Sequence, residues 1–239
     1  MADALETFIR AYDHLPVDHY SRDGNRFRRH QRFVLVPRPL TLIPTAVSQY
    51  SQSLRLNPRD GDTIRDFEPL PSELVQNAFL RALILHDFEN SPFASISSNN
   101  LAYDVGLHLV RLRPRLGQPA ISSPNRLHKD GEWITWIHLV SRHNVSGGES
   151  LVTDNDKELL LRSTLRRPLD TLGVWDHSVY HHVSQVDVAE GHDEGYRDVL
   201  LVDFTPMVPT TNYETLAERA TDDLRRHFTD QAMPGRAGY

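Results

Sequence analysis

VGLHLVRL at residues 105–112 and WITWIHLV at residues 133–140 are the first two of six short β-like runs in this 239-residue chain. The other four are SLVT at 150–153, TLGVW at 171–175, VYHHVSQVDV at 179–188 and YRDVLLVDF at 196–204. Turn residues such as Gly147-Gly148 separate them, and regular spacing of this kind is typical of a sandwich or barrel. We therefore predict an all-β core of the sandwich or jelly-roll type, with helices packed outside it.

The segments around these runs predict the flanking helices. Helical spacing of apolar residues predicts helices over 4–15, after a capping Ser72, and over about 156–165. Thr211-x-x-Glu214 forms a capping box that predicts a last helix over 211–231. The Arg-rich stretch 20–31 is expected on the surface, 33–36 as a strand and 57–62 as a turn. The chain is expected to be one domain, 1–239, with a helical N-terminal region over residues 1–90 and a β core over about 100–205.

Composition limits the classes of partner and cofactor. The net charge of −6 argues against nucleic acid or an anionic membrane as a partner, and the apolar runs are too short to cross a bilayer. The N-terminus lacks an export signal, so we expect a cytoplasmic protein, and a homodimer remains open. Because there is no Cys but there are 13 His, any metal must be held by His, Asp or Glu.

The segment His128-Lys129-Asp130-Gly131 is the most informative for chemistry. In an extended chain, residues i and i+2 point to the same side, so one imidazole and one carboxylate would converge. A third ligand could come from the pair His181-His182, 53 and 54 residues after His128. Two His and one carboxylate on one face of a metal form the facial triad of non-heme Fe(II) oxygenases, which leaves three positions open. The alternative is that His128 and Asp130 lie on the surface.

Arg197 opens a largely apolar strand, and a buried guanidinium needs an anionic partner. A 2-oxoglutarate whose keto-acid end chelates iron would offer its far carboxylate to Arg197 through two parallel hydrogen bonds. The alternatives are a partner in Asp198 or Asp203, or simple exposure to solvent.

Several motifs, in this order, carry a family resemblance from about Tyr50 to Phe204. They are Gln52-Ser53, Asn57, Ile64-Arg65-Asp66-Phe67, His128-x-Asp130-Gly131, Ser141-Arg142-His143-Asn144-Val145-Ser146-Gly147-Gly148-Glu149-Ser150, Pro168-Leu169-Asp170-Thr171-Leu172, Asp176, His181-x-Val183-Ser184 and Arg197-Asp198-Val199-Leu200. The chain resembles the bacterial Fe(II)/2-oxoglutarate-dependent dioxygenases of the L-isoleucine dioxygenase type. Ser141 and Ser184-Gln185 depart from the family pattern of Asn and Thr-Pro, and this leaves the substrate open.

The resemblance implies a mainly β fold with flanking helices, the double-stranded β-helix or cupin-like jelly roll. It implies Fe(II) held by His128, Asp130 and His181 rather than His182, 2-oxoglutarate bound by Arg197, and O₂ as oxidant. The expected substrate is a free L-amino acid or derivative, oxidised at an unactivated C–H bond, by hydroxylation in the default case. Ring closure to a cyclopropane or desaturation of a modified amino acid, such as a nitro amino acid in natural-product biosynthesis, is the alternative with the same catalyst.

Hypotheses of other classes are a non-oxygenase β-barrel that binds zinc and a purely structural module. Two further features have two interpretations each. One of Arg111, Arg113 and Arg115 could clamp a substrate carboxylate, or all three could lie on a solvated strand face. Asp176 could support a metal ligand or shape a turn, and the three Trp residues are expected to pack and shape a dry pocket.

Overall fold

A computed structural model describes residues 1–21, 23–46, 49–51, 63–91, 93, 101–122, 126–176 and 178–208. Three helices lie near the N-terminus: α1 (Ala2–Arg10), which continues into the 3-10 turn η1 (Ala11–His14), α2 (Ser72–Val75) and α3 (Ala78–Glu89). None of the helices in these ranges is long and apolar enough to span a membrane. The expected helix 211–231 and turn 57–62 lie outside the described residues.

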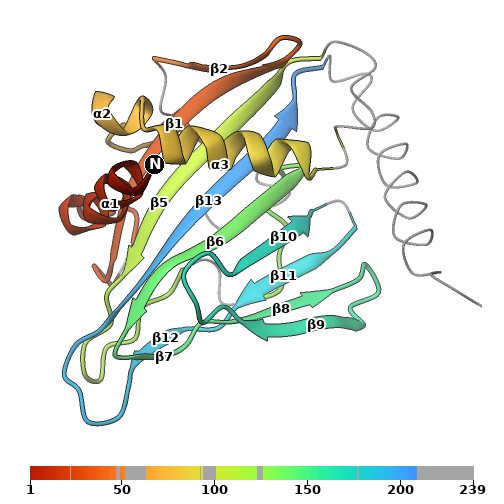
Figure 1. Cartoon of the computed structure of the whole chain (residues 1–239). Helices are drawn as coiled ribbons and strands as arrows, with labels where there is room; N and C mark the ends of the chain where they lie inside the picture. The colour runs from red at the N-terminus through yellow and green to blue at the C-terminus, as the bar shows by residue number, and fades with distance from the viewer. Residues whose placement is uncertain are drawn as a thin grey trace, which may run out of the picture.

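One six-stranded antiparallel sheet dominates the molecule, in the order β10-β6-β13-β5-β1-β2 (Figure 1). Its strands are β1 (Arg26–Pro37), β2 (Leu40–Pro44), β5 (Tyr103–Leu112), β6 (Ile134–His143), β10 (Thr171–Trp175) and β13 (Tyr196–Pro206). Strand β13, the last of the described strands, lies between β5 and β6, and it pairs with β5 from Arg197 to Pro206 and with β6 from Tyr196 to Phe204. The first and last strands of the β core, β5 and β13, are thereby neighbours in the middle of the main sheet.

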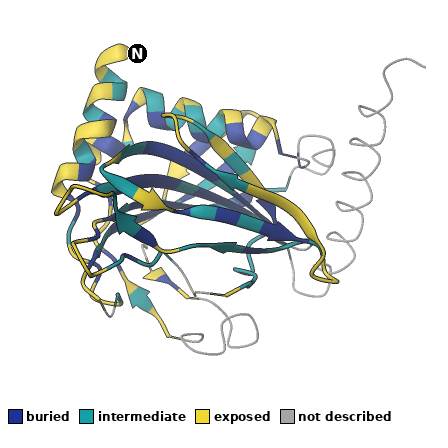
Figure 2. Cartoon of the chain, turned by 90° about the horizontal axis from the view of Figure 1, so that it is seen from below, coloured by how far each residue is buried: buried dark blue, intermediate teal, exposed yellow. Residues whose placement is uncertain are grey.

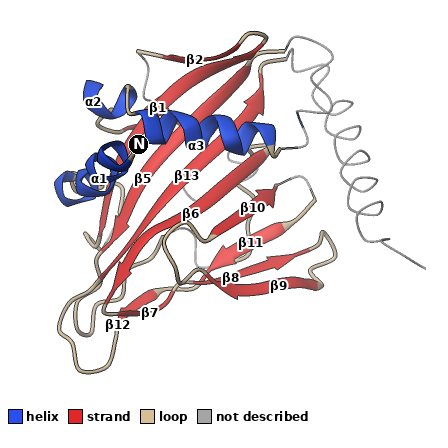
Figure 3. Cartoon of the chain, viewed as in Figure 1, coloured by secondary structure: helices blue, strands red, loops and turns tan. Residues whose placement is uncertain are grey.

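Smaller sheets complete the β structure. One has the order β11-β8-β9 and contains β8 (Glu149–Thr153), β9 (Leu159–Thr164) and β11 (Tyr180–Val183). The others pair β7 (Val145–Gly147) with β12 (Val186–Val188), and β3 (Gln49–Tyr50) with β4 (Arg65–Asp66). Figure 3 shows the β7–β12 and β11-β8-β9 sheets on the side of the molecule away from the helices.

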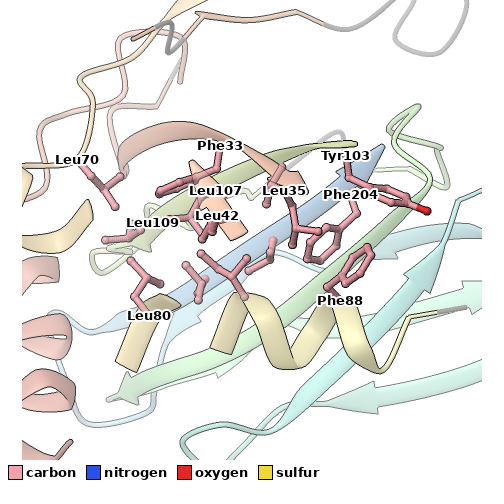
Figure 4. Packing of buried hydrophobic residues seen from close by; sticks show 14 of the residues in the cluster. Phe33, Leu35, Leu42, Leu70, Leu80, Phe88, Tyr103, Leu107, Leu109 and Phe204 are labelled. Atoms are coloured by element: carbon pink, nitrogen blue, oxygen red, sulfur yellow. The ribbon is translucent and has the colours of Figure 1, made fainter. Parts of the chain in front are cut away.

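The two faces of the main sheet differ in chemistry because side chains alternate along each strand. On β13, Leu200, Val202 and Phe204 are fully buried in the hydrophobic core under α3, together with residues such as Leu107, Leu109 and Phe33 (Figure 4). The intervening residues of β13 turn to the other face, where Arg197, Val199, Leu201 and Asp203 line a cavity. The sheet therefore separates an apolar core from a partly polar cavity.

Helix α3 lies across the helix-side face of the sheet and begins at a side-chain cap. Asn77 Oδ1 accepts a 3.0 Å hydrogen bond from the backbone N–H of Leu80, and its amide also donates to the carbonyl of Ala4 at 2.8 Å. Leu80, Ile84 and Phe88 face the core, while the outer surfaces of the helices are exposed (Figure 2). The break at Gln76 and Asn77 divides the predicted helix after Ser72 into α2 and α3, and Asn77 rather than Ser72 provides the cap.

Three sequence-based expectations were wrong. Residues 26–37 form β1 of the main sheet, so residues 26–31 of the Arg-rich stretch are not a surface segment. Arg26 and Arg28 of this strand line the cavity, so its polar residues need not face water. The N-terminal region 1–90 is also not only helical. Residues 159–164 form the edge strand β9 instead of a helix, since they pair with β8. Residues 179–188 are two strands, β11 and β12, that belong to different sheets.

Candidate metal centre and its cavity

His128, Asp130 and His181 meet at one point. One ligand atom from each lies within 4.8 Å of the other two, and the three could hold a metal ion. Asp130 lies 3.5 Å from His128 Nε2 through Oδ1 and 3.1 Å from His181 Nε2 through Oδ2. Both imidazoles are buried, and the side chain of Asp130 is 25% exposed. Burial acts to raise the pKa of Asp130, but the two imidazoles, His181 first, hold it well below its usual range.

Backbone pairing fixes the two imidazoles next to each other. His128 lies in the segment between β5 and β6, and it exchanges two backbone hydrogen bonds of 3.0 Å with His181 on β11. His128 Nδ1 lies 2.9 Å from the carbonyl oxygen of Arg126, so Nδ1 carries the proton and Nε2 is free to bind a metal. The following residue on β11, His182, does not line the cavity.

Asp176, directly after β10, holds the metal-binding segment in place. Its Oδ1 accepts a 3.0 Å hydrogen bond from the backbone N–H of Asp130, and its Oδ2 accepts one of 2.8 Å from the N–H of Gly131. Oδ1 also lies 3.8 Å from Nδ1 of His181. Burial, and then the charge of Asp130, raise the pKa of Asp176 to about 6. Asp176 thus contacts two of the three residues of the triad, and a supporting role is favoured over that of a simple turn residue.

Arg197 lies at the beginning of β13 with its guanidinium in the same cavity and only 2% of its surface exposed. Its Nε and Nη2 are buried and have no hydrogen-bond partner among the described residues. Burial first, and then Arg142, lower its pKa to about 10, so it stays charged at neutral pH. Both carboxylates considered as partners are occupied elsewhere: Asp198 binds Arg111, and Asp203 binds Thr135 and His108.

Gly148 packs against the Arg197 side chain. A Cβ at Gly148 would lie 3.1 Å from both Cδ and Nε of Arg197, and the backbone φ of +68° is one that glycine adopts readily. Gly148 therefore leaves the space in which the guanidinium lies. A buried, unpartnered cation in a cavity is suited to a ligand carboxylate, because an unpaired buried charge is costly.

The cavity has a volume of about 1010 Å³ and extends well beyond the triad and Arg197. At this size it is at the upper end of the range for small-molecule sites, roughly 300–1,000 Å³. Its polar wall includes Arg28 and His108 from β1 and β5, together with Glu132 and Asp203. Glu132 and Arg28 were not predicted as site residues.

The remaining residues considered as candidates lie outside the cavity. Arg111 binds both carboxylate oxygens of Asp198, at 2.7 and 2.9 Å, and Arg113 pairs with Glu194 at 3.0 Å. Arg115 is exposed, and none of the three Arg residues lines the cavity. The three Trp residues do pack, with Trp133 and Trp175 in the core beneath α3, but they do not line the cavity either.

Comparison with known proteins agrees with this geometry. Residues 10–203 match the model of the 2OG-Fe dioxygenase family. The 3(1)-hydroxy-L-isoleucine 4-dioxygenase of Pantoea ananatis (strain AJ13355) is 30% identical over 204 residues, 84% of this chain and 81% of that protein. The L-isoleucine-4-hydroxylase of Bacillus thuringiensis is 29% identical over 195 residues, 79% of this chain and 80% of that protein.

Solved structures support the fold. The crystal structure of IDO from Bacillus thuringiensis aligns with a TM-score of 0.70 at 25% identity, over 87% of this chain and 84% of that one. A bsmA homolog from Methylobium petroleophilum PM1 aligns with a TM-score of 0.74 at 23% identity, over 85% and 81%. These alignments confirm the predicted mainly β jelly roll with flanking helices. The family implies Fe(II), 2-oxoglutarate and O₂, in agreement with the cofactors expected from the sequence. The chain belongs to the 2OG-Fe dioxygenase family.

Proposed function

We propose that His128, Asp130 and His181 hold Fe(II), that Arg197 binds the distal carboxylate of 2-oxoglutarate, and that the enzyme hydroxylates a C–H bond of a free L-amino acid. The observation that carries the proposal is the pairing, in one cavity, of a three-ligand cluster with a buried guanidinium whose Nε and Nη2 lack a partner among the described residues. The donor set fits Fe(II), because two imidazoles and one carboxylate on one face leave positions open for ligands. The named relatives act on isoleucine and its hydroxy derivative, which supports an amino-acid substrate.

Fe(II) held there would supply the activation of O₂: in the overall reaction, one atom of O₂ would enter succinate as 2-oxoglutarate loses CO₂, and the other would become the hydroxyl group of the substrate. The chain's own residues position these reactants. Arg197 fixes one end of 2-oxoglutarate through charge-assisted hydrogen bonds, which sets the direction of its keto-acid end toward the triad. Asp176 holds the backbone of Asp130 and Gly131, so the carboxylate ligand keeps its position.

The test is an anaerobic titration of Fe(II)-loaded protein with 2-oxoglutarate, followed by the visible charge-transfer band of the complex. We expect a band for the wild type and a weaker one for Arg197→Ala at equal 2-oxoglutarate concentration. Gly148→Ala should also weaken it, because the added Cβ would displace Arg197. Gly117→Ala is the matched control: its φ of +72° is similar, but a Cβ there meets nothing within 4 Å. A zinc-binding barrel without oxygenase activity would give no band with any of these proteins.

Hydroxylation and its alternatives, ring closure or desaturation, are distinguished by product mass in a succinate-release screen of free amino acids and nitro derivatives. A gain of one oxygen indicates hydroxylation, and a loss of two hydrogens indicates the alternatives. A cytoplasmic location, a single domain over 1–239, the absence of nucleic-acid and membrane partners, and a homodimer stay predictions.

A further inference from the structure

A second buried guanidinium lies in the cavity, on a different strand from Arg197. Arg28 on β1 is 9% exposed and lines the cavity. Its Nε is buried without a hydrogen-bond partner, and no carboxylate of the described residues lies within ion-pair distance of its side chain. Its neighbours are the aromatic rings of Phe67 and Tyr50, with centroids 4.4 and 5.4 Å from Cζ. Within the described ranges, Arg28 is therefore a cation without an anion.

The register of the main sheet separates Arg28 from Arg197. Arg197 stands opposite Leu112 of β5, whose other neighbour is Arg26 of β1. Arg28 is two strands from β13 and two residues further along, which places the two Cα atoms roughly 12 Å apart from standard strand spacings. A single 2-oxoglutarate bound by its distal carboxylate at Arg197 and by its keto-acid end at the metal has no further carboxylate for Arg28. Arg28 is thus suited to a second carboxylate-bearing ligand.

A carboxylate lies close to Arg28, joined to it through one imidazole. Arg28 Nη2 lies 2.5 Å from Nδ1 of His108, and Nε2 of His108 lies 3.1 Å from Oδ2 of Asp203. A guanidinium only donates, so His108 accepts at Nδ1 and donates from Nε2 to Asp203. Burial first, and then Arg28, hold the pKa of His108 well below its usual value, so the ring stays neutral. The imidazole of His108 thereby lies between the guanidinium of Arg28 and the carboxylate of Asp203 on one wall of the cavity.

Asp203 has capacity for a further donor. Oδ1 accepts a 2.9 Å hydrogen bond from Thr135 and Oδ2 accepts from His108, which uses two of about four acceptor positions on a carboxylate. Gly106 keeps this position open, because a Cβ there would lie 2.8 Å from Oδ2. Burial raises the pKa of Asp203 to about 7, and a cation bound beside its carboxylate would favour the charged form.

We propose that Arg28 binds the α-carboxylate of the substrate and Asp203 its α-ammonium, so that the polar wall of the cavity recognises a free amino acid as a zwitterion. The two groups share one carbon in an amino acid, and the Arg28–His108–Asp203 row offers a cation and an anion side by side. This inference rests on the proposed function, because it places the amino acid in the same cavity as the Fe(II) and 2-oxoglutarate sites. It leaves the side chain of the substrate to extend toward the metal.

The test compares three related ligands by isothermal titration calorimetry. A panel of the proteinogenic L-amino acids is titrated into the protein with 2-oxoglutarate bound, and the tightest ligand is compared with its decarboxylated amine and its deaminated carboxylic acid. We expect the wild type to bind the amino acid about 10²-fold or more tightly than either analogue, the order expected for loss of one partner of a buried charge pair. Arg28→Met should reduce the preference for the amino acid over the amine to below about tenfold and keep its preference over the carboxylic acid. Asp203→Asn should reduce the preference over the carboxylic acid to below about tenfold and keep that over the amine.

Arg26→Met is the matched control. Arg26 is on the same face of β1 and lines the same cavity, but it already pairs with Asp18 at 2.6 Å and donates to the carbonyl of Ser122 at 2.8 Å. Its preference ratios should match the wild type, and circular dichroism of all four proteins checks folding. The proposal is overturned if no amino acid binds, if the wild type binds the amine as tightly as the amino acid, or if Arg28→Met and Arg26→Met change the ratios equally.

The anaerobic Fe(II)–2-oxoglutarate band separates this proposal from the proposed function. We expect the band to persist in Arg28→Met and Asp203→Asn, because neither residue is placed at the 2-oxoglutarate site. Loss of the band in folded Arg28→Met would overturn the zwitterion proposal in favour of a 2-oxoglutarate role for Arg28. Absence of the band in every protein, with the preference ratios as expected, would overturn the proposed oxygenase and leave the zwitterion site standing.

Discussion

Replacement of Asp176 should show the effect of a residue that positions the metal ligands without binding the metal itself. Its two carboxylate oxygens accept hydrogen bonds from the backbone N–H groups of Asp130 and Gly131, one each. A hydrogen bond to a charged acceptor contributes about 1.5–3 kcal/mol. Asp176→Ala removes both, so the free energy of unfolding of the metal-free protein should fall by about 3 kcal/mol or more. Asp176→Asn keeps one acceptor but turns an NH₂ group toward an N–H donor, and it should destabilise nearly as much.

The metal affinity should fall as well, because Asp130 and His181 both depend on the position of Asp176. Loss of such outer partners typically weakens metal binding by about 10–100-fold. Urea unfolding of the metal-free proteins gives the stability, and anaerobic titration with Fe(II) against a chelator gives the dissociation constant.

Asp170→Asn provides a matched control for this experiment. Asp170 Oδ2 accepts hydrogen bonds from the backbone N–H groups of Arg166 and Arg167 at 2.7 and 2.8 Å, and it does not line the cavity. Its replacement should leave Fe(II) affinity unchanged. The reasoning is refuted if Asp176→Asn binds Fe(II) as tightly as the wild type, or if Asp170→Asn weakens Fe(II) binding to the same degree.

Three further outcomes follow from contacts outside the metal site. Arg111→Ala leaves the buried carboxylate of Asp198 without its cation and should cost about 3–5 kcal/mol in urea unfolding, with the 2-oxoglutarate band intact; a band lost together with stability would contradict a structural role. Asn77→Ala removes the cap of α3 and should cost about 1 kcal/mol, measured as a lower unfolding midpoint, whereas an unchanged midpoint would count against the cap. Folding raises the pKa of Glu132 to about 8 and of Asp203 to about 7, so the folded chain binds more protons than the unfolded one above the usual carboxyl range. The free energy of unfolding of the metal-free protein should therefore fall as pH rises toward about 8, and Glu132→Gln should flatten that slope; a slope of the opposite sign would refute it.

The residues and the family resemblance together predicted the cluster of His128, Asp130 and His181 that the structure brings together; the resemblance was needed to choose His181 over His182. His128 and Asp130 stand two residues apart, and His181 lies on a short β-like run. Arg197 stood out because a guanidinium in an apolar strand needs a partner, and the structure leaves it without one among the described residues. Asp176 was noticed, but the backbone groups that it binds could not be read from sequence.

The polar wall of the cavity could not be predicted in this way. Arg28 lies in a polar, Arg-rich stretch, and polarity does not distinguish a strand that faces water from one that faces a polar cavity. Residues 28–32 of β1 are all polar, so alternation of polar and apolar residues gave no signal for this part of the strand. The run Leu159–Leu161 gave a helical pattern, but pairing with β8 makes it a strand, because tertiary contacts override short apolar patterns.

The alternation along β13 has a consequence for how enzymes of this kind can diversify. Leu200, Val202 and Phe204 secure the fold, whereas Val199 and Leu201, on the opposite face, border the cavity. Val199 is also buried in a second hydrophobic cluster, but Leu201 is only partly buried against it. A change in the size of residue 201 is therefore a route to new substrate lengths without loss of the scaffold. Selection for stability and selection for substrate binding act here on neighbouring residues of one strand, yet they need not conflict.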